Sequence, residues 1–504
     1  MRLLLSLLAL SAAAARAALL YSPADFHLLS AVRSVDLASG SLARIQDIHV
    51  VRLPAARQRD STHAELDYFL ALSAAEAAQL SFFECLAKSG GGLQASDRAV
   101  LQPERVVGAS LPGSQLFRVA LPARFFAQQH DTVDAPDVTL TCASVVLHQA
   151  APLPREVAQK EDMFLHWRGD SAPRTLYGAD KGRVKVRVPH PRILSFANSG
   201  GAEATKSGTT ITFGPYESIA PLAPGAELSV GSVHYLHDSP VISLVDAERH
   251  VEISHWGDNA AVEDRLWLRN DGPQLKGHFS RIDHQMSSFY TKDNSHVLNS
   301  LVMHLPAGAK DAYYLDQIGN ISTSHFRPSP PSPPHSFTST HLLPSNRASS
   351  LDLNPRYPLL GGWNFTFSVG FNLGLSEGGW GKHLGGAKYS VAIPFLTPIT
   401  DVAVDMARTR IVLPEGASDI SVSLPFSVDS ETHGLYTTYL DSTGRPCVLL
   451  ERARCSDQHG GNVIVRYSYS PAAHARKPVV IGLIALAAFT AAMVGRRVES
   501  KIGA

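Results

Sequence analysis

The stretch GRVKVRVPH, residues 182–190, alternates valines with basic residues, and this period of two is typical of a half-buried β-strand. The same alternation recurs in TTITFGPY (209–216), HVEISHW (250–256) and NVIVRYSYS (462–470). Turn signals such as Asn270-Asp271-Gly272 separate these runs. We therefore predict a mainly β fold built from antiparallel β-sandwich-like domains.

Helical patterns are sparse in the β-rich part of the chain. The segment STHAELDYFLALSAAEAAQLSFFECLAK (61–88) contains good helix formers in places, and we predict a mixture of helix and strand for it. The pattern changes near 238–246, so we place one β-rich domain at 18–240 and a second at 245–470. Within the second domain, residues 327–350 are rich in proline and serine, which predicts a disordered insertion.

The first residues, MRLLLSLLALSAAAARA (1–17), predict a signal peptide. Arg2 precedes an apolar run of about twelve residues, and Ala15 and Ala17 are placed as a cleavage site. The run is too short for a membrane span, which needs roughly 20 apolar residues. We expect the β-rich domains to enter the secretory pathway.

A second apolar stretch, PVVIGLIALAAFTAAMV (478–494), carries no charge and lies near the other end of the chain. At 1.5 Å per residue it reaches about 26 Å, enough for a single transmembrane helix with Pro478 in its first turn. Residues 495–504 would form a short cytosolic tail of a single-pass type I protein. Small residues would permit close approach of another helix, although alanine also suits a helix that faces lipid alone. The candidates are Gly482, Ala485, Ala488 and Ala492, with Ala487 and Ala491 beside them.

Charge and cysteine content narrow the function further. Lysine plus arginine equal aspartate plus glutamate at 45 each, so the chain has no net positive charge that would attract nucleic acid. The four cysteines, Cys85, Cys142, Cys447 and Cys455, are too few for a disulfide scaffold, and their pairing stays open. One option is a small loop closed by Cys447 and Cys455.

Two patterns resemble catalytic or metal sites, and both are better explained otherwise. GLSEG centres on Ser376, but a nucleophile elbow needs a helix after the serine, and GWGKHLGG is too rich in glycine for one. His250 and Glu252 share one face of a strand while His255 points the other way, so the three do not converge on a metal. We therefore predict no catalytic residue, cofactor or metal site.

Two sequons are candidate N-glycosylation sites. Asn320-Ile321-Ser322 follows Ile318-Gly319, where we predict a turn, and Asn364-Phe365-Thr366 lies in a strand-like run. The simpler alternative is that a sequon arises by chance on a buried strand. We predict Asn320 and Asn364 as acceptors.

Several blocks, taken in order, resemble the ribophorin I family. The resemblance covers about residues 251–469 and is much weaker before them. The blocks are VEISHWGDNAAVEDRLWLRNDGPQLKGHFSRID (251–283), LPAGAKDAYYLDQIGNISTSH (305–325), PRYPLLGGWNFTFSVGFNL (355–373), VLPEGASDI (412–420) and YLDSTGRP (439–446).

This resemblance implies a non-catalytic subunit of the oligosaccharyltransferase complex in the endoplasmic reticulum membrane, with its N-terminal domains in the lumen. The complex transfers a preassembled oligosaccharide from dolichyl diphosphate to asparagine in Asn-X-Ser/Thr of nascent proteins. The implied partners are a multi-pass catalytic subunit, small accessory membrane subunits and nascent polypeptides. Two alternatives remain: a type I membrane receptor or cargo-binding, lectin-like protein of the secretory pathway, and a lumenal hydrolase centred on Ser376.

Overall fold

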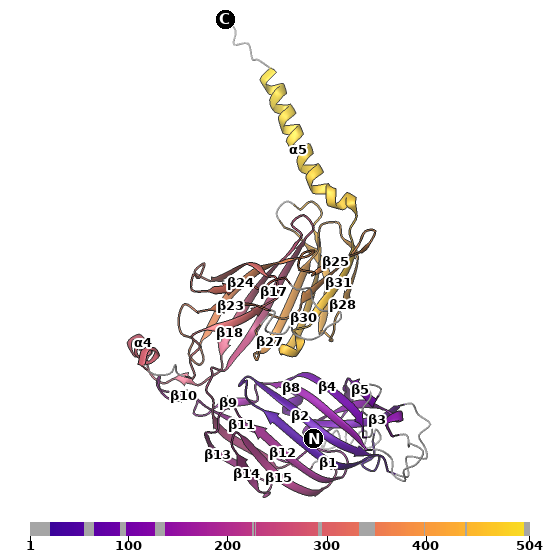
Figure 1. Cartoon of the computed structure of the whole chain (residues 1–504), viewed down its shortest axis with the longest axis vertical. Helices are drawn as coiled ribbons and strands as arrows, with labels where there is room; N and C mark the ends of the chain where they lie inside the picture. Colours follow the sequence, from indigo (N-terminus) through magenta and orange to yellow (C-terminus); the bar gives the residue numbers. More distant parts are fainter. Residues whose placement is uncertain are drawn as a thin grey trace, which may run out of the picture.

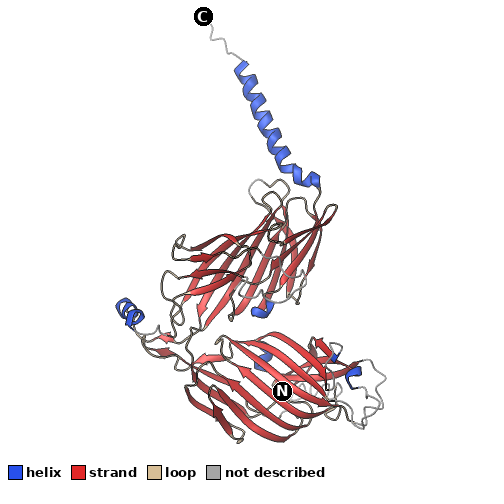
Figure 2. Cartoon of the chain, viewed as in Figure 1, coloured by secondary structure: helices blue, strands red, loops and turns tan. Residues whose placement is uncertain are grey.

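The computed structural model describes residues 21–54, 65–90, 97–126, 137–223, 226, 228–290, 295–331, 348–397, 399–438 and 441–497. Within them the chain forms two β-rich lobes and one long C-terminal helix (Figures 1 and 2). The second lobe lies between the first lobe and the helix. The mainly β fold with one C-terminal apolar helix, predicted from the sequence, is confirmed. The predicted signal peptide, 1–17, lies outside the described residues.

The first lobe is built on a large sheet with the strand order β14-β15-β12-β1-β2-β8-β4-β5. Its strands are β1 (His27–Asp36), β2 (Leu42–Arg52), β4 (Leu80–Ser89), β5 (Arg98–Leu101), β8 (Val138–Leu147), β12 (Ala179–Arg187), β14 (Ala204–Ser207) and β15 (Thr210–Ile219).

Two smaller sheets cover one face of this large sheet. On β1, Ala31 packs in a core with Tyr68 of one small sheet, and Val35 packs in a core with Trp167 of the other. Ala31 and Val35 share a face because alternate strand residues point the same way. One small sheet is β3 (Glu65–Ser73), β7 (Ser114–Pro122) and β6 (Glu104–Leu111); the other is β13 (Ile193–Asn198), β16 (Val230–Leu236), β11 (Phe164–Asp170) and β9 (Ala150–Pro152).

The second lobe has the same three-sheet construction around one continuous core. Its large sheet has the order β21-β24-β18-β17-β27-β30-β29, formed by β17 (Ile242–Ser254), β18 (Asn259–Asn270), β21 (Lys310–Asp316), β24 (Asn364–Gly374), β27 (Ala403–Val412), β29 (Ser430–Tyr436) and β30 (Arg445–Cys455). The small sheets are β20 (Leu301–Leu305), β23 (Ser349–Leu353) and β22 (His325–Arg327), and then β25 (Gly381–Gly385), β26 (Lys388–Pro394), β31 (Asn462–Ser468) and β28 (Ser418–Ser423).

The two lobes repeat one topology. Each of these first-lobe strands has a counterpart in the second lobe, and wherever two first-lobe strands are neighbours in a sheet, their counterparts are neighbours too. These first-lobe strands are β1, β2, β3, β4, β6, β7, β8, β9, β11, β12, β13, β14, β15 and β16. Their counterparts, in the same order, are β17, β18, β20, β21, β22, β23, β24, β25, β26, β27, β28, β29, β30 and β31. The direction is kept as well: β1 runs parallel to β12, and β17 runs parallel to β27. The second lobe is therefore a structural copy of the first.

These parallel pairs correct one part of the sequence prediction, which was for antiparallel sheets. The partner of β1 is formed only after well over a hundred further residues, far more than the dozen or so that a parallel crossover requires at minimum. The alternation within a strand shows that it is half-buried but does not reveal the direction of a distant neighbour. All four quoted alternating segments do lie in strands, β12, β15, β17 and β31.

Residues 61–88 illustrate how packing overrides propensity. Their described part is β3, a short helix α3 (Ala74–Ala78) and β4, so the predicted mixture is correct but strand dominates. Ser73 caps α3, because its side chain accepts a hydrogen bond from the Glu76 backbone while the Glu76 side chain accepts from the Ser73 backbone.

The Pro/Ser-rich segment is ordered at both ends, where we had predicted disorder. Arg327 is the last residue of β22, and Ser349 is the first residue of β23, which pairs with both β20 and β22. The middle of the segment, residues 332–347, lies outside the described part of the chain.

The lobes touch through a polar junction with a small apolar centre. Arg44 of β2 lies 2.8 Å from Asp457 and 2.5 Å from Asp401, and Ala403 packs among Leu42, Val145 and Leu147. A two-stranded sheet, β10 (Glu156–Val157) with β19 (Gln274–Leu275), also joins the two halves. In the described part of the chain, the other helical elements are α4 (Arg281–Tyr290), η2 (Ala123–Phe126) and η3 (Asp457–His459).

Candidate functional site: the membrane helix and the cavity at its root

Helix α5 spans Pro471–Arg497 and begins seven residues before the predicted start. Ser470 precedes it, and its side chain accepts a hydrogen bond from the Ala473 backbone at 3.1 Å, while Pro471 occupies the first helical position. Pro478 therefore lies inside the helix rather than in its first turn, which corrects the prediction. Its missing N–H removes one helix hydrogen bond, and Figure 1 shows α5 bent near its root.

Helix α5 is long and apolar enough to cross a membrane. None of its residues is buried against the lobes. The predicted contact residues Gly482, Ala485, Ala488 and Ala492 are all exposed, and nothing lies within 4 Å of a Cβ built on Gly482. At 100° per residue, the four fall within about a third of the helix circumference, so they form one face. The contact itself stays a prediction.

A cluster of ion pairs fixes the root of α5 to the second lobe. Lys477 bonds to Asp441, and its amine lies 3.5 Å from Glu415, whose side chain is almost fully buried. Burial raises the pKa of Glu415, but hydrogen bonds from Ser442 and Thr443 outweigh it and lower that pKa to about 2. The carboxylate is therefore charged at neutral pH.

Beside this root lies a cavity of about 330 Å³. Its lining comes from the end of β17 and the following turn, from residues near Glu415 and Arg445, and from the first two turns of α5. Trp256 stacks on His474 with ring centroids 4.3 Å apart and planes 5° apart, yet remains 60% exposed. The cavity thus joins the lobe to the helix at the point where the chain would enter a membrane.

The three residues considered for a metal site do not converge, and His255 contacts a different partner from His250 and Glu252. His250 lies 3.1 Å from Glu252, whose second oxygen accepts a hydrogen bond from Arg445 at 2.8 Å. His255 contacts the Tyr467 hydroxyl at 2.9 Å, and burial lowers its pKa. Across the described ranges, no group of three or more His, Cys, Asp or Glu side chains is placed to hold a metal ion.

Ser376 lies in the loop between β24 and β25, as its glycine-rich surroundings predicted. Its hydroxyl bonds to the Asp258 carboxylate, and its backbone N–H lies 3.3 Å from the same side chain. This serine anchors a turn.

Both sequon asparagines have exposed side chains. Asn320 follows a turn closed by Asp316, which accepts backbone hydrogen bonds from Ile318 and Gly319 at 2.9 Å. Asn364 is the first residue of β24. An exposed position suits an acceptor, and modification stays a prediction.

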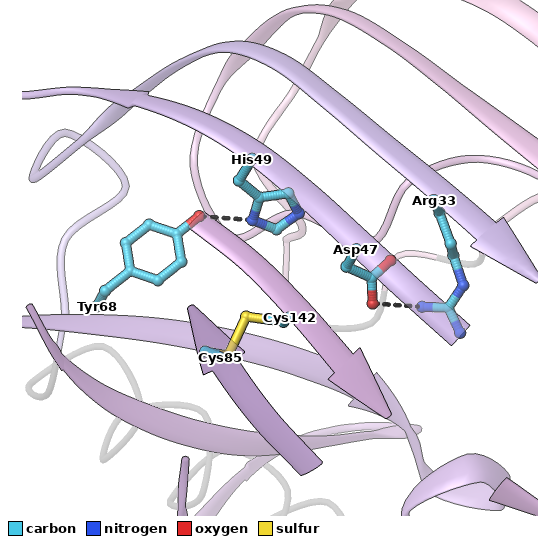
Figure 3. Close-up of a disulfide and its surroundings, with 6 residues drawn as sticks. All are labelled: Arg33, Asp47, His49, Tyr68, Cys85 and Cys142. Atoms are coloured by element: carbon cyan, nitrogen blue, oxygen red, sulfur yellow. Dashed lines mark hydrogen bonds and ion pairs between the residues drawn. A yellow bond between two sulfur atoms is a disulfide. The ribbon is translucent and has the colours of Figure 1, made fainter. Parts of the chain in front are cut away.

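The structure pairs Cys85 with Cys142 and leaves Cys447 and Cys455 as free thiols (Figure 3). Cys85 and Cys142 lie directly opposite each other on β4 and β8. The considered Cys447–Cys455 loop is wrong because both residues lie on β30, where eight residues of strand separate them by roughly 26 Å.

Buried ion pairs occupy matching positions in the two lobes, and sequence reasoning missed them. Arg33 on β1 faces Asp47 on β2 (Figure 3), and Arg249 on β17 faces Asp264 on β18. Both arginine side chains are only 3% exposed. The signal was present: Arg33 lies between Ala31 and Val35 on the apolar face of its strand.

A family model described as Ribophorin I matches residues 26–496. A Caenorhabditis elegans protein named as subunit 1 of the dolichyl-diphosphooligosaccharide–protein glycosyltransferase is 31% identical over 354 residues, covering 70% of this chain and 56% of the relative. Subunit 1B from Arabidopsis thaliana is 30% identical over 334 residues, covering 66% of each chain. The matched region thus spans between half and two thirds of these relatives. Among solved structures, native yeast LTA4 hydrolase is 10% identical over 46% of this chain and 33% of its own, and its TM-score of 0.24 supports no conclusion.

Proposed function

Because the chain belongs to the ribophorin I family, we propose that it is a non-catalytic subunit of the dolichyl-diphosphooligosaccharide–protein glycosyltransferase complex of the endoplasmic reticulum. The observation that carries this proposal is the family match, which runs from the first strand of the first lobe to the end of α5. In this role the chain holds other subunits together, and transfer of the oligosaccharide takes place in another subunit.

The architecture supports a scaffolding role. Each lobe is built from three sheets, and the two lobes are joined by ion pairs and by the β10–β19 sheet. The ion pairs of Lys477 tie α5 to the second lobe. Such an arrangement holds both lobes at a fixed position relative to the membrane helix, and we place them near the path of emerging acceptor polypeptides.

A lumenal location for both lobes follows from the proposed signal peptide, with residues 495–504 as the cytosolic tail. The Cys85–Cys142 disulfide supports it, because disulfides persist in oxidising compartments. The exposed side chains of Asn320 and Asn364 would then be accessible to glycosylation.

The proposed partners in the membrane are the multi-pass catalytic subunit and a small accessory subunit. The face formed by Gly482, Ala485, Ala488 and Ala492 would allow another helix to approach closely. Among the residues that the structure describes, none in the lobes buries a residue of this helix.

Affinity purification of the tagged full chain from detergent-solubilised microsomes tests the proposal. We expect the other transferase subunits to co-purify in comparable amounts. The control is the same chain with residues 478–494 replaced by the span of an unrelated type I protein, which should recover fewer membrane partners. Absence of every other subunit from the wild-type sample would overturn the proposal and favour a free-standing receptor or cargo-binding protein.

A further inference from the structure

The cavity at the root of α5 lies at a defined depth relative to a membrane. The uncharged part of α5 starts at Pro478, and the cavity is lined by Ala473, His474, Arg476 and Lys477, which come just before it. Tryptophan and tyrosine favour the boundary between hydrocarbon and water, and Trp256 lines the same cavity. Once α5 spans a bilayer, the cavity is level with the lipid headgroups.

The charges in the cavity are mixed, and most are paired within the protein. Arg445 binds Glu252, and Lys477 is engaged by Asp441 and Glu415. Within the described part of the chain, Arg476 has no carboxylate partner, and its guanidinium only contacts the Thr443 hydroxyl at 3.4 Å. One guanidinium is therefore free to take an anionic oxygen, such as that of a phosphate.

The cavity also offers a site for a cation. His474 stacks on one face of the Trp256 indole, and Trp256 is still 60% exposed, so much of its surface is accessible to a ligand. The face of a tryptophan attracts quaternary ammonium groups.

From this arrangement we propose that the cavity binds the zwitterionic headgroup of a phosphatidylcholine lipid. Arg476 binds the phosphate, the open face of Trp256 holds the quaternary ammonium, and the acyl chains lie along the start of α5. The volume of about 330 Å³ is at the lower end of the range for small-molecule sites, roughly 300–1,000 Å³, and suits a headgroup rather than a whole lipid. The proposal depends only on α5 crossing a membrane, not on the subunit role.

Native mass spectrometry of the full chain in detergent, titrated with a palmitoyl-oleoyl phosphatidylcholine, tests this site. We expect one saturable lipid adduct. Trp256→Ala and Arg476→Gln should each weaken it by about fivefold to tenfold, as the loss of one cation–π or charge-assisted contact implies. Matched controls are Trp363→Ala, another partly exposed tryptophan outside the cavity, and Arg496→Gln at the far end of α5, and both should bind as the wild type does.

Two further ligands distinguish the source of the headgroup. Phosphatidylglycerol supplies the phosphate without the ammonium and should bind more weakly, and free phosphocholine, lacking the membrane, should bind far more weakly still. Equal binding by the wild type and both cavity variants, or equal affinity for phosphatidylglycerol, would overturn the proposal. Saturation by free phosphocholine at the lipid's own affinity would instead indicate a soluble ligand. Thermal melts of the variants confirm that each is folded.

Discussion

Arg249 and Asp264 lie directly opposite each other on β17 and β18 and form a bidentate ion pair, with both nitrogen–oxygen distances at 2.7 Å and neither side chain more than 3% exposed. The guanidinium also donates to the Pro394 carbonyl at 2.7 Å, so one arginine links the large sheet to the end of β26. The ion pair itself lies within the large sheet, and only the contact with Pro394 reaches the sheet packed against it.

Arg249→Leu should destabilise the second lobe by about 3–5 kcal/mol, because Asp264 is left charged and unpaired in the core. Denaturant unfolding followed by tryptophan fluorescence measures the change. The double variant Arg249→Leu/Asp264→Leu should recover much of the loss. Arg118→Leu, which breaks a solvent-exposed pair with Asp67, is the control and should cost less than about 1 kcal/mol. A loss for Arg249→Leu as small as for the control would refute a structural role for the pair.

Peptide mapping under non-reducing conditions should recover Cys85 linked to Cys142 and both Cys447 and Cys455 as thiols. Cys447 should react with a maleimide in the native protein, whereas Cys455 should react only after unfolding, because burial excludes the reagent and raises its pKa to about 12.

Replacing both Cys85 and Cys142 with alanine should cost about 2–4 kcal/mol, as expected when a 57-residue separation is no longer cross-linked. Differential scanning calorimetry measures the melting temperature of this double variant. Cys447→Ala, which breaks no disulfide, is the control and should melt at the temperature of the wild type. Recovery of a Cys447–Cys455 peptide in the mapping experiment would contradict the structure.

Asn320→Gln and Asn364→Gln should each remove one glycan, seen as a downward gel shift that endoglycosidase treatment abolishes. Ser322→Ala should reproduce the effect of Asn320→Gln, whereas Ser322→Thr should keep the glycan, since only a hydroxyl residue completes the sequon. Asn259→Gln, which is outside any sequon, should leave the mobility unchanged. An unshifted Asn320→Gln band would show that this site is unused.

The protein should lose stability as the pH falls from about 6.5 towards 4. Burial lowers the pKa of His49 and His237 to about 4 and that of His459 to about 3, so each is neutral in the folded protein and binds a proton on unfolding. Each contributes up to about 1.4 kcal/mol of lost stability per pH unit in this window.

Melting temperatures recorded between pH 7.5 and 5 check this prediction. His459→Gln should flatten the dependence, and His433→Gln, at an exposed position, should not. A melting temperature that rises as the pH falls would show that other groups dominate. One such opposing group is Asp47, whose pKa burial raises to about 6 despite Arg33.

The strands were the part of the fold that the sequence predicted best. Alternation such as GRVKVRVPH directly reports which face of a strand is buried, so strand positions follow from local pattern. The pairing of β1 with β12, and the correspondence between the lobes, are not local. They depend on which distant strand completes the buried face, and the repeated features, such as Arg33 and Arg249, are too few to align the halves from sequence alone.

The site was harder to foresee than the fold. The apolar run predicted α5, but its polar first turns depend on the Ser470 cap and on the pairing of Lys477 with Asp441. The cavity combines residues from four separate parts of the chain, near Glu252, Glu415, Arg445 and His474. Four cysteines allow three pairings, and only the register of β4 against β8 selects Cys85 with Cys142.

The repeated topology gives the chain the same exit strand in each lobe. The chain leaves the first lobe after β16 to start the second, and it leaves the second lobe after β31, the counterpart of β16, to start α5. The strand that leads from the first lobe into the second thus corresponds to the strand that leads from the second lobe into the membrane helix. An additional lobe inserted between β31 and Pro471 would therefore leave the strand order of both existing lobes unchanged and place one more three-sheet unit between them and the membrane.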